Sequence, residues 1–220
     1  MRTAIIAGAG SGIGKALLIQ LSINSRAIGL SRRGEEDKSE LVSGKNYKCD
    51  LRIESEIKNI FDKVQSIDSI YITLGDGLFK PFHELTLTEW NDHLELNLTA
   101  PFLILKSAYP YLKKSINPLV VLISSTAGKV GFPDSSAYCT TKHGIAGLAK
   151  SLREEWKPDI RVVTVYPGAI YTPIWEGREG FNKNDMITEK DFAIQLSTLE
   201  SSPLSLNIEE MYILPRKGIL

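Results

Sequence analysis

A short apolar run that ends in a cluster of glycines constrains the fold of this chain more than any other feature. Thr3–Ala7 has the length of a buried strand, and apolar residues at helical spacing follow the glycines. Glycines between a strand and a helix let backbone N–H groups approach an anion at the positive end of the helix. The spacing is Gly8-x-x-x-Gly12-x-Gly14, and Ile13 stands where the usual Gly-x-Gly-x-x-Gly pattern has its third glycine. The segment is therefore either a phosphate-binding loop or a tight structural turn.

Apolar runs of strand length alternate with amphipathic helical patterns along the chain. The predicted strands are Thr3–Ala7, Arg26–Leu30, Tyr47–Cys49, Ser69–Leu74, Leu119–Ser124, Arg161–Tyr166 and Met211–Leu214. The predicted helices are Ile13–Leu21, Ile53–Gln65, Thr86–Leu98, Phe102–Leu112, Tyr138–Trp156 and Glu189–Thr198, with at most a short one around Ser39–Val42. Such alternation predicts a doubly wound parallel α/β sheet (a Rossmann fold) of about seven strands, with helices on both faces. With 220 residues and no linker, the chain is predicted to be a single domain, 1–220.

The composition argues against several classes of function. Acidic and basic residues are equal in number, 26 of each, which argues against nucleic-acid and membrane-surface roles. The two cysteines, Cys49 and Cys139, are too few for a disulfide framework, and the three histidines lack ligand spacing, so no metal is expected. Strand-like sequence from Thr3 leaves no room for a signal peptide, and no apolar run reaches membrane-spanning length. We therefore expect a cytoplasmic protein.

Two arginines follow the second predicted strand, at the position that faces the adenosine ribose in dinucleotide-binding folds. An acidic residue there binds a free 2′-hydroxyl, whereas an arginine accommodates a 2′-phosphate. Ser31, Arg32 and Arg33 provide a hydroxyl and two guanidinium groups, which bind phosphate as bidentate forks. The arginines are either a solvated charge pair or a phosphate contact. With the glycine loop before them, we predict NADP(H) as the preferred cofactor and NAD(H) as the alternative.

Later strand and helix ends carry further polar candidates. Asp50 follows the third strand, where its carboxylate is placed to accept a hydrogen bond from an adenine amine and to cap the next helix, two uses that are compatible. The fourth strand runs into a second glycine-bearing loop that begins at Gly75. Asn97 lies in an apolar helical context, and a buried amide needs partners. It belongs either to a structural kink or to a polar network with water.

The segment after the fifth strand combines groups suited to acid–base chemistry. Ser125 follows the strand and is expected to point into the crevice beyond the carboxyl edge of the sheet, where open α/β sheets bind ligands. Tyr138 and Lys142 are four residues apart on the next predicted helix, so the ammonium lies near the phenol. Alone, such a pair is most often a surface feature of a helix. Its context here favours an acid–base device.

Two predicted helices carry more apolar residues than one sheet face can cover. Phe102–Leu112 is apolar on more than one side, and Tyr138–Trp156 shows the same excess. Helices of this kind are buried on both sides. A second copy of the chain is the expected cover, so we predict a homodimer or homotetramer.

Taken in chain order, these features resemble the short-chain dehydrogenase/reductase family over nearly the whole sequence. The separation of Ser125 and Tyr138 by thirteen residues is also the spacing of that family. The resemblance implies that Tyr138 is the general acid/base and that Ser125 holds and polarises the substrate oxygen. It further implies that Lys142 binds the nicotinamide ribose and lowers the pKa of Tyr138, and that Asn97 holds a water in a proton relay. Besides Tyr138 and Lys142, the implied cofactor contacts are Gly8, Gly10, Ser11, Gly12, Ile13, Gly14, Ser31, Arg32, Arg33, Asp50, Leu51, Gly75, Pro167, Gly168, Ile170 and Thr172.

The sequence departs from the family pattern in the segments that hold the cofactor. Ala7 replaces a threonine whose hydroxyl braces the glycine loop, and Ser11 stands where a basic residue is found in the family. Residues 72–75 read Ile-Thr-Leu-Gly in place of Asn-Asn-Ala-Gly, so side-chain amides are missing. The family's glycine-rich finish is also absent from this sequence. None of these changes removes a reacting group.

These patterns predict an NADPH-dependent carbonyl reductase, or the reverse alcohol dehydrogenase, that acts on a small carbonyl or alcohol substrate. The alternative, motivated by the departures, is a non-catalytic dinucleotide-binding or sensor protein of the same fold. A nucleotide-sugar epimerase is disfavoured because an extra domain is missing. The segment 173–188 carries Trp175, Arg178, Phe181 and Met186, and predicts a loop that closes over a partly apolar, aromatic-lined pocket.

Overall fold

The core of the protein is a seven-stranded parallel sheet, shown by a computed structural model that describes residues 1–175, 180 and 182–219. The strand order is β3-β2-β1-β4-β5-β6-β7, and every neighbouring pair is parallel. The strands are β1 (Thr3–Ala7), β2 (Arg26–Ser31), β3 (Asn46–Lys48), β4 (Ser69–Ile72), β5 (Leu119–Ile123), β6 (Arg161–Pro167) and β7 (Glu210–Ile213). The doubly wound α/β fold predicted from the sequence is confirmed.

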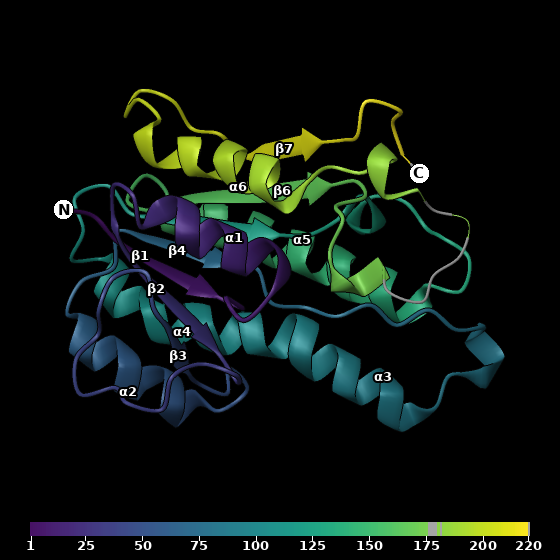
Figure 1. Cartoon of the computed structure of the whole chain (residues 1–220), viewed down its shortest axis with the longest axis horizontal. Helices are drawn as coiled ribbons and strands as arrows, with labels where there is room; N and C mark the ends of the chain where they lie inside the picture. Colours follow the sequence, from purple (N-terminus) through teal and green to yellow (C-terminus); the bar gives the residue numbers. More distant parts are fainter. Residues whose placement is uncertain (176–179, 181, 220) are drawn as a thin grey trace.

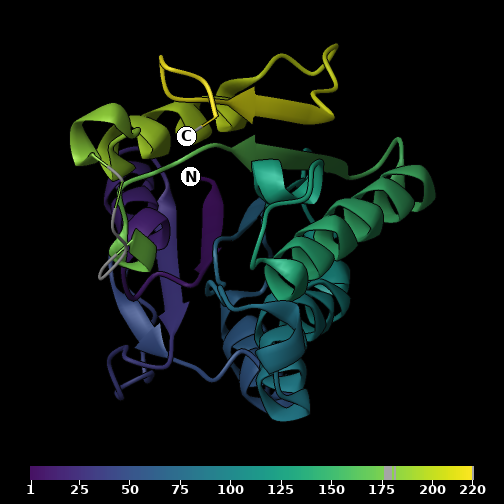
Figure 2. The same cartoon turned by 90° about the vertical axis from the view of Figure 1, so that its right-hand side faces the viewer.

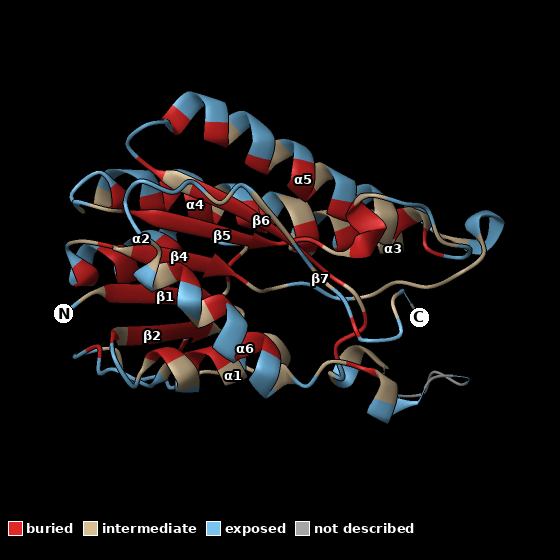
Figure 3. Cartoon of the chain, turned by 90° about the horizontal axis from the view of Figure 1, so that it is seen from above, coloured by how far each residue is buried: buried red, intermediate tan, exposed pale blue. Residues whose placement is uncertain are grey.

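Helices cover both faces of the sheet (Figures 1 and 2). They are α1 (Gly12–Leu21), α2 (Glu54–Val64), α3 (Leu87–Leu94), α4 (Ala100–Leu112), α5 (Ser136–Trp156) and α6 (Glu189–Ser197). Side chains of α1 and α6 form one apolar cluster with the sheet, and those of α2, α4 and α5 form the other. Successive strand residues alternate between the clusters, so Ile6 joins the first and Ile5 the second. The central strands β2, β1, β4, β5 and β6 are buried over most of their length, whereas the edge strands β3 and β7 and the outer sides of the helices are partly exposed (Figure 3).

The predicted helices Thr86–Leu98 and Phe102–Leu112 join into one continuous helix. Between α3 and α4, Glu95–Thr99 forms a π-turn in which the Ala100 N–H donates to the Glu95 carbonyl. Pro101 has no N–H to give to the α-helical ladder, and the wider turn before it carries the helix past this gap. The predicted break between the two helices was therefore wrong.

The short helix predicted around Ser39–Val42 does not form. The Tyr47 hydroxyl accepts a hydrogen bond from the Val42 N–H (2.6 Å) and donates to the Glu40 carbonyl (2.9 Å). These backbone groups are therefore satisfied by a buried side chain instead of a helical ladder.

The described residues show neither a membrane span nor a metal cluster. No described helix combines the length and the apolar character that crossing a bilayer requires. Within the same part of the chain, no three His, Cys, Asp or Glu side chains gather at metal-binding distance. Cys49 and Cys139 are both free, and burial raises the pKa of the Cys49 thiol to about 12.

The glycine loop after β1 is packed tightly against the end of β4. The Thr73 hydroxyl donates to the Ala7 carbonyl at 2.8 Å and joins the ends of the two strands. Gly8 has a φ of +99°, and a Cβ there would lie 2.6 Å from the Leu74 nitrogen. A Cβ on Gly14 would lie 2.3 Å from the Gly8 carbonyl oxygen. Only glycine fits at both positions.

Gly14→Ala is expected to destabilise the protein, because the added methyl would overlap the Gly8 carbonyl and lie 2.5 Å from Thr73 Oγ1. Overpacking of this kind costs about 1–3 kcal/mol. Gly147→Ala is the matched control. It lies inside α5 with no atom within 4 Å of its would-be Cβ, and should raise the free energy of unfolding by roughly 0.5–1 kcal/mol. Urea unfolding measures both changes, and equal stability of the two variants would contradict this packing.

Candidate active site

The carboxyl ends of the strands border a cleft of about 640 Å³. It lies where the strand order reverses between β1 and β4, which is where open α/β sheets bind ligands. The predicted site residues that line it are Gly8, Gly10, Ser11, Gly12, Ile13, Ser31, Arg32, Arg33, Asp50, Leu51, Gly75, Ser125, Tyr138, Lys142, Pro167, Gly168, Ile170 and Thr172. Gly14 and Asn97 do not line the cleft, because each is packed behind a lining glycine.

One end of the cleft is formed by the glycine loop and two exposed arginines. α1 begins at Gly12 and has no acidic residue in its first turn, so its free N–H groups present a positive end to the cleft. The Arg33 guanidinium extends over the loop, where Nη2 donates to Ser11 Oγ at 3.4 Å. Arg32 and Arg33 are both exposed. This end is therefore suited to an anion.

The carboxylate of Asp50 is held by Arg52, a lining residue that sequence reasoning missed. Arg52 Nε and Nη2 donate to it at 3.0 and 2.7 Å, and the Arg52 backbone N–H donates at 3.1 Å. Hydrogen bonds from the Arg52 side chain hold the pKa of Asp50 below its usual range. The N-cap of α2 is Ile53, without a side-chain cap, so the prediction that Asp50 caps this helix is wrong. The sequence did contain a signal for this ion pair, because Arg52 follows Asp50 by only two residues and carries the opposite charge.

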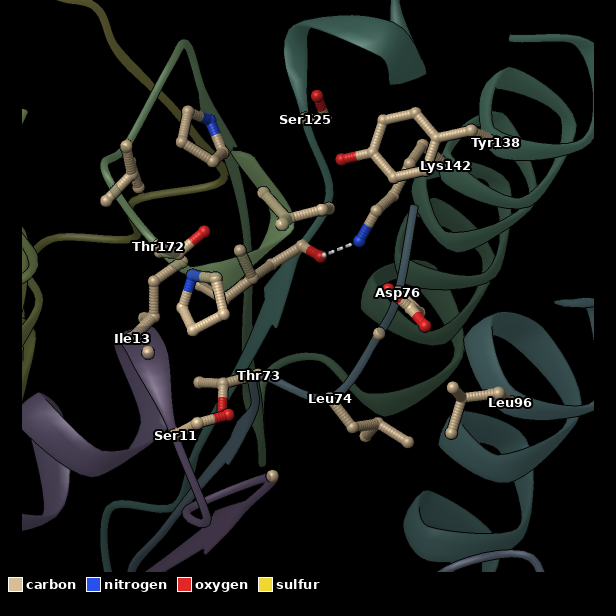
Figure 4. Close-up of a pocket in the computed structure, with 18 of the residues that line it drawn as sticks. Ser11, Ile13, Thr73, Leu74, Asp76, Leu96, Ser125, Tyr138, Lys142 and Thr172 are labelled. Atoms are coloured by element: carbon tan, nitrogen blue, oxygen red, sulfur yellow. Dashed lines mark hydrogen bonds between the residues drawn. The ribbon is translucent and has the colours of Figure 1, made fainter. Parts of the chain in front are cut away.

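Ser125, Tyr138 and Lys142 converge at the other end of the cleft (Figure 4). The hydroxyl groups of Ser125 and Tyr138 point into the cavity, and Lys142 Nζ lies 5.6 Å from the centre of the Tyr138 ring. The Ser125 Oγ accepts a hydrogen bond from the Ala127 N–H at 3.1 Å, so its own hydrogen can be donated elsewhere. A phenol, a hydroxyl and an ammonium in this arrangement can hold an oxygen atom and exchange a proton with it.

Close packing between α5 and the loop after β5 positions these groups. The Ser124 hydroxyl donates to the Lys142 carbonyl at 2.8 Å, and a Cβ on Gly128 would lie 2.7 Å from the same carbonyl oxygen. The Lys142 ammonium donates to the Ile123 carbonyl at 3.2 Å. The helix that carries Tyr138 is therefore fixed against the strand end that carries Ser125.

Lys142 is a buried cation without a carboxylate partner among the described residues. Its side chain is 6 % exposed, and no described Asp or Glu forms an ion pair with it. Burial lowers its pKa to about 8. At neutral pH it still carries a charge, and that charge acts on its neighbours in the cleft.

Asn97 lies behind Gly75 and is 2 % exposed. Its Oδ1 accepts a hydrogen bond from the Asp76 N–H (2.8 Å), and its Nδ2 donates to the Asp76 carbonyl (3.1 Å). Nδ2 also contacts the buried ring of His93. Asn97 sits on the π-turn and in a cluster of hydrogen bonds between protein groups, and the water of the predicted network stays a prediction.

Apolar side chains line the cleft near Tyr138, and most of them were not predicted. They are Phe79, Phe132, Ile174, Trp175 and Ile219. Phe79 packs on Tyr138 with ring centres 5.4 Å apart. Of the predicted closing loop 173–188, Trp175 lines the cleft, while Met186 is buried away from it. Arg178 and Phe181 lie outside the described residues.

The chain matches the family model for short chain dehydrogenases over residues 2–182. An uncharacterized oxidoreductase of Staphylococcus epidermidis is 25% identical over 97% of both chains. A tropinone reductase homologue of Arabidopsis thaliana is 31% identical over 82% of this chain and 73% of its own.

Among solved structures, a metagenomic short-chain oxidoreductase in complex with NADP superimposes with a TM-score of 0.80 at 26% identity, and the match covers 97% of this chain and 96% of the other. The family model covers most of the sequence. The cleft is lined by the loops that follow the carboxyl ends of the strands. This protein therefore belongs to the short-chain dehydrogenase/reductase family, as the sequence resemblance predicted, and is an NAD(P)-dependent oxidoreductase.

Proposed function

We propose that this protein is an NADPH-dependent enzyme that transfers hydride between nicotinamide and a carbonyl or alcohol substrate, with Tyr138 as the general acid/base. The observation that carries the proposal is the convergence of Tyr138, Ser125 and Lys142 at one end of a cleft. The other end presents the exposed guanidinium groups of Arg32 and Arg33. The metagenomic relative that binds NADP supports the choice of cofactor.

The residues of the cleft fit a dinucleotide phosphate. The glycine loop admits no Cβ at Gly8, so backbone can approach a pyrophosphate closely there. Arg33 lies over that loop, and guanidinium groups bind phosphate as forks. Lys142 brings a buried charge with no carboxylate partner among the described residues, which suits ribose hydroxyl groups as acceptors. When bound, the cofactor supplies or accepts the hydride.

The proton is handled by the protein. Ser125 donates its one hydroxyl hydrogen to the substrate oxygen, while the Ala127 N–H donates to one of its lone pairs. In the direction of reduction, Tyr138 donates its phenolic proton to the same oxygen as negative charge develops there. The Lys142 ammonium, whose Nζ lies 5.6 Å from the centre of the Tyr138 ring, then stabilises the phenolate. With the negative charge placed at the ring centre and an effective dielectric constant near 20, the attraction is roughly 3 kcal/mol.

The substrate end of the cleft suits a compound with an apolar or aromatic part beside its carbonyl group. Phe79 and Phe132 approach from loops after β4 and β5, and Ile174 and Trp175 from the segment after β6. Phe79 packs directly on Tyr138. Apolar side chains of this kind bind the apolar part of a substrate by excluding water. They do not fix the position of its carbonyl group.

We also infer that the enzyme acts in the cytoplasm as a homodimer or homotetramer and that residues 1–220 form one domain. Phe102 and Tyr109 project from the outer side of α4 and are 48 % and 40 % exposed. Large apolar side chains on one helix face support an interface with a second copy.

A purely binding or sensor protein is the rival function. It was motivated by the loss of hydroxyl and amide groups near the cofactor loops, and the Thr73–Ala7 hydrogen bond replaces one of those lost contacts. Hydride transfer from NADPH to a panel of aldehydes and ketones separates the two. Tight NADPH binding without turnover on any member of the panel would favour the rival.

Tyr138→Phe should abolish turnover and leave NADPH binding nearly unchanged, because it removes one oxygen and keeps the ring that packs on Phe79. General acid–base catalysis contributes about 10²–10⁴-fold, and we expect a loss of that size in kcat. Tyr109→Phe, on the exposed side of α4, is the control and should behave as wild type. Steady-state rates and NADPH fluorescence titrations measure both. Full activity of Tyr138→Phe would end the proposed role.

Arg33→Ala should weaken NADPH binding by about ten- to a hundredfold and leave NADH affinity within about threefold, because only NADPH carries the 2′-phosphate. Lys58→Ala, an exposed cation on α2 away from the cleft, controls for general charge effects. Binding titrations with NADPH and NADH measure the two affinities in the wild type and in each variant. Equal affinity of the wild type for NADPH and NADH would remove the preference.

The value of kcat/KM should fall as the pH rises through about 8, the pKa to which burial lowers Lys142. Above this pH the side chain is neutral in the free enzyme and no longer stabilises the Tyr138 phenolate or binds ribose hydroxyl groups as a cation. A pH profile of kcat/KM for NADPH, measured at limiting NADPH and saturating substrate, reports the free enzyme and tests this. A profile that stays flat well above this pH would show that the charge of Lys142 is not needed.

A further inference from the structure

A buried histidine lies directly behind the candidate active site and has no role in the function proposed above. His93 is in the last turn of α3 and is 6 % exposed. Asn97 follows one turn later, on the π-turn. The other two histidines, His83 and His143, are exposed. Burial of an imidazole among polar neighbours requires a partner for each of its ring nitrogens.

The ring of His93 faces the amide of Asn97. Asn97 Nδ2 lies 2.8 Å from His93 Nε2 and 3.0 Å from Nδ1. The orientation of this amide is fixed independently, because its Oδ1 accepts the Asp76 N–H. An amide nitrogen has hydrogens to donate and no lone pair to offer. One hydrogen goes to the Asp76 carbonyl, and the other is directed at the imidazole.

His93 also contacts the helix that carries Tyr138. Its Nε2 lies 3.4 Å from Thr141 Oγ1, whose hydrogen is donated to the Tyr138 carbonyl at 2.9 Å. In a neutral imidazole one ring nitrogen accepts the Asn97 amide hydrogen and the other carries a hydrogen, and both nitrogens lie within 3.0 Å of Nδ2. The His93 and Tyr138 rings are 6.2 Å apart. The imidazole thus bridges the π-turn and α5.

This arrangement requires a neutral imidazole. A charged ring has only N–H groups to offer and would repel the Asn97 amide hydrogens. The groups that face it are Lys142 and Tyr138 from α5 and Asp76 from the loop after β4. Burial and the charge of Lys142 lower the pKa of His93 to about 4, against an opposing effect of Asp76.

We propose that His93 is a positioning residue of this active site, which as a neutral imidazole holds the Asn97 amide and ties the π-turn to the helix of Tyr138 and Lys142. The inference rests on the proposed function. A Cβ on Gly75 would lie 2.7 Å from Asn97 Oδ1 and 3.5 Å from Lys142 Nζ, so these groups are closely packed. If the amide turns, the loop that it holds moves against Lys142.

Two substitutions separate this role from simple packing. His93→Leu fills much of the volume and removes both hydrogen bonds, whereas His93→Gln can still accept from Asn97 and donate to Thr141. We expect His93→Leu to lower kcat by roughly 10- to 100-fold with KM for NADPH within about threefold, and His93→Gln to recover most of the loss. His83→Leu is the matched control at an exposed histidine and should leave kcat unchanged.

A histidine titration by NMR tests the same inference without turnover. The three imidazole signals are assigned by their absence in His93→Gln and His83→Leu. We expect the His93 signal to stay that of a neutral ring down to about pH 4. Protonation of His93 below about pH 4 is expected to lower kcat/KM, and His93→Gln should lack this acid step.

The outcomes distinguish the two proposals. A wild type without turnover on any carbonyl compound contradicts the proposed function, and the titration still tests His93. An active wild type with kcat of His93→Leu within twofold of it overturns the positioning role. An equal loss in His93→Leu and His93→Gln, with both variants folded by circular dichroism, also overturns it. So does titration of His93 well above pH 4.

Discussion

The arrangement of the cleft depends on how closely β1 and β4 approach at the point where the strand order reverses. The Thr73 hydroxyl joins the end of β4 to the Ala7 carbonyl, and Gly8 and Gly14 leave no space for a side chain beside it. The glycine loop is thereby pressed against the segment that leads to Gly75. The loop that contains Gly75 is packed in turn against Asn97, behind the end of the cleft that holds Tyr138 and Lys142. One packed contact therefore couples the two ends of the cleft.

Two departures from the family pattern form parts of a single contact. Ala7 lacks the hydroxyl that braces the loop from β1, and Thr73 supplies a hydroxyl from the neighbouring strand to the Ala7 carbonyl. Considered separately, Ala7 loses the family's threonine hydroxyl and Thr73 loses a side-chain amide. Thr73 follows Ile72, the sheet partner of Ala7, so its hydroxyl braces the end of β1 from the neighbouring segment. The reasons for expecting a weakened cofactor site are correspondingly fewer.

The sequence was sufficient for the strands and for the residues at their carboxyl ends, because strands buried on both faces appear as continuous apolar runs. It was less informative about contacts between side chains. Spacing along the chain did not show that Asn97 lies behind Gly75 or that Phe132 reaches the cleft. Such contacts depend on the packing of distant segments, which local periodicity does not record.

The wide turn between α3 and α4 determines which side of α3 meets the active-site helix. A π-turn holds one residue more than the α-helical turn that it replaces. Deleting one residue from Glu95–Thr99 would restore a regular helix and rotate α3 by about 100° about its axis. His93 would then swing away from Thr141 and from the Asn97 amide. At this position the number of residues in the helix, as much as their chemical identity, sets the geometry of the catalytic end.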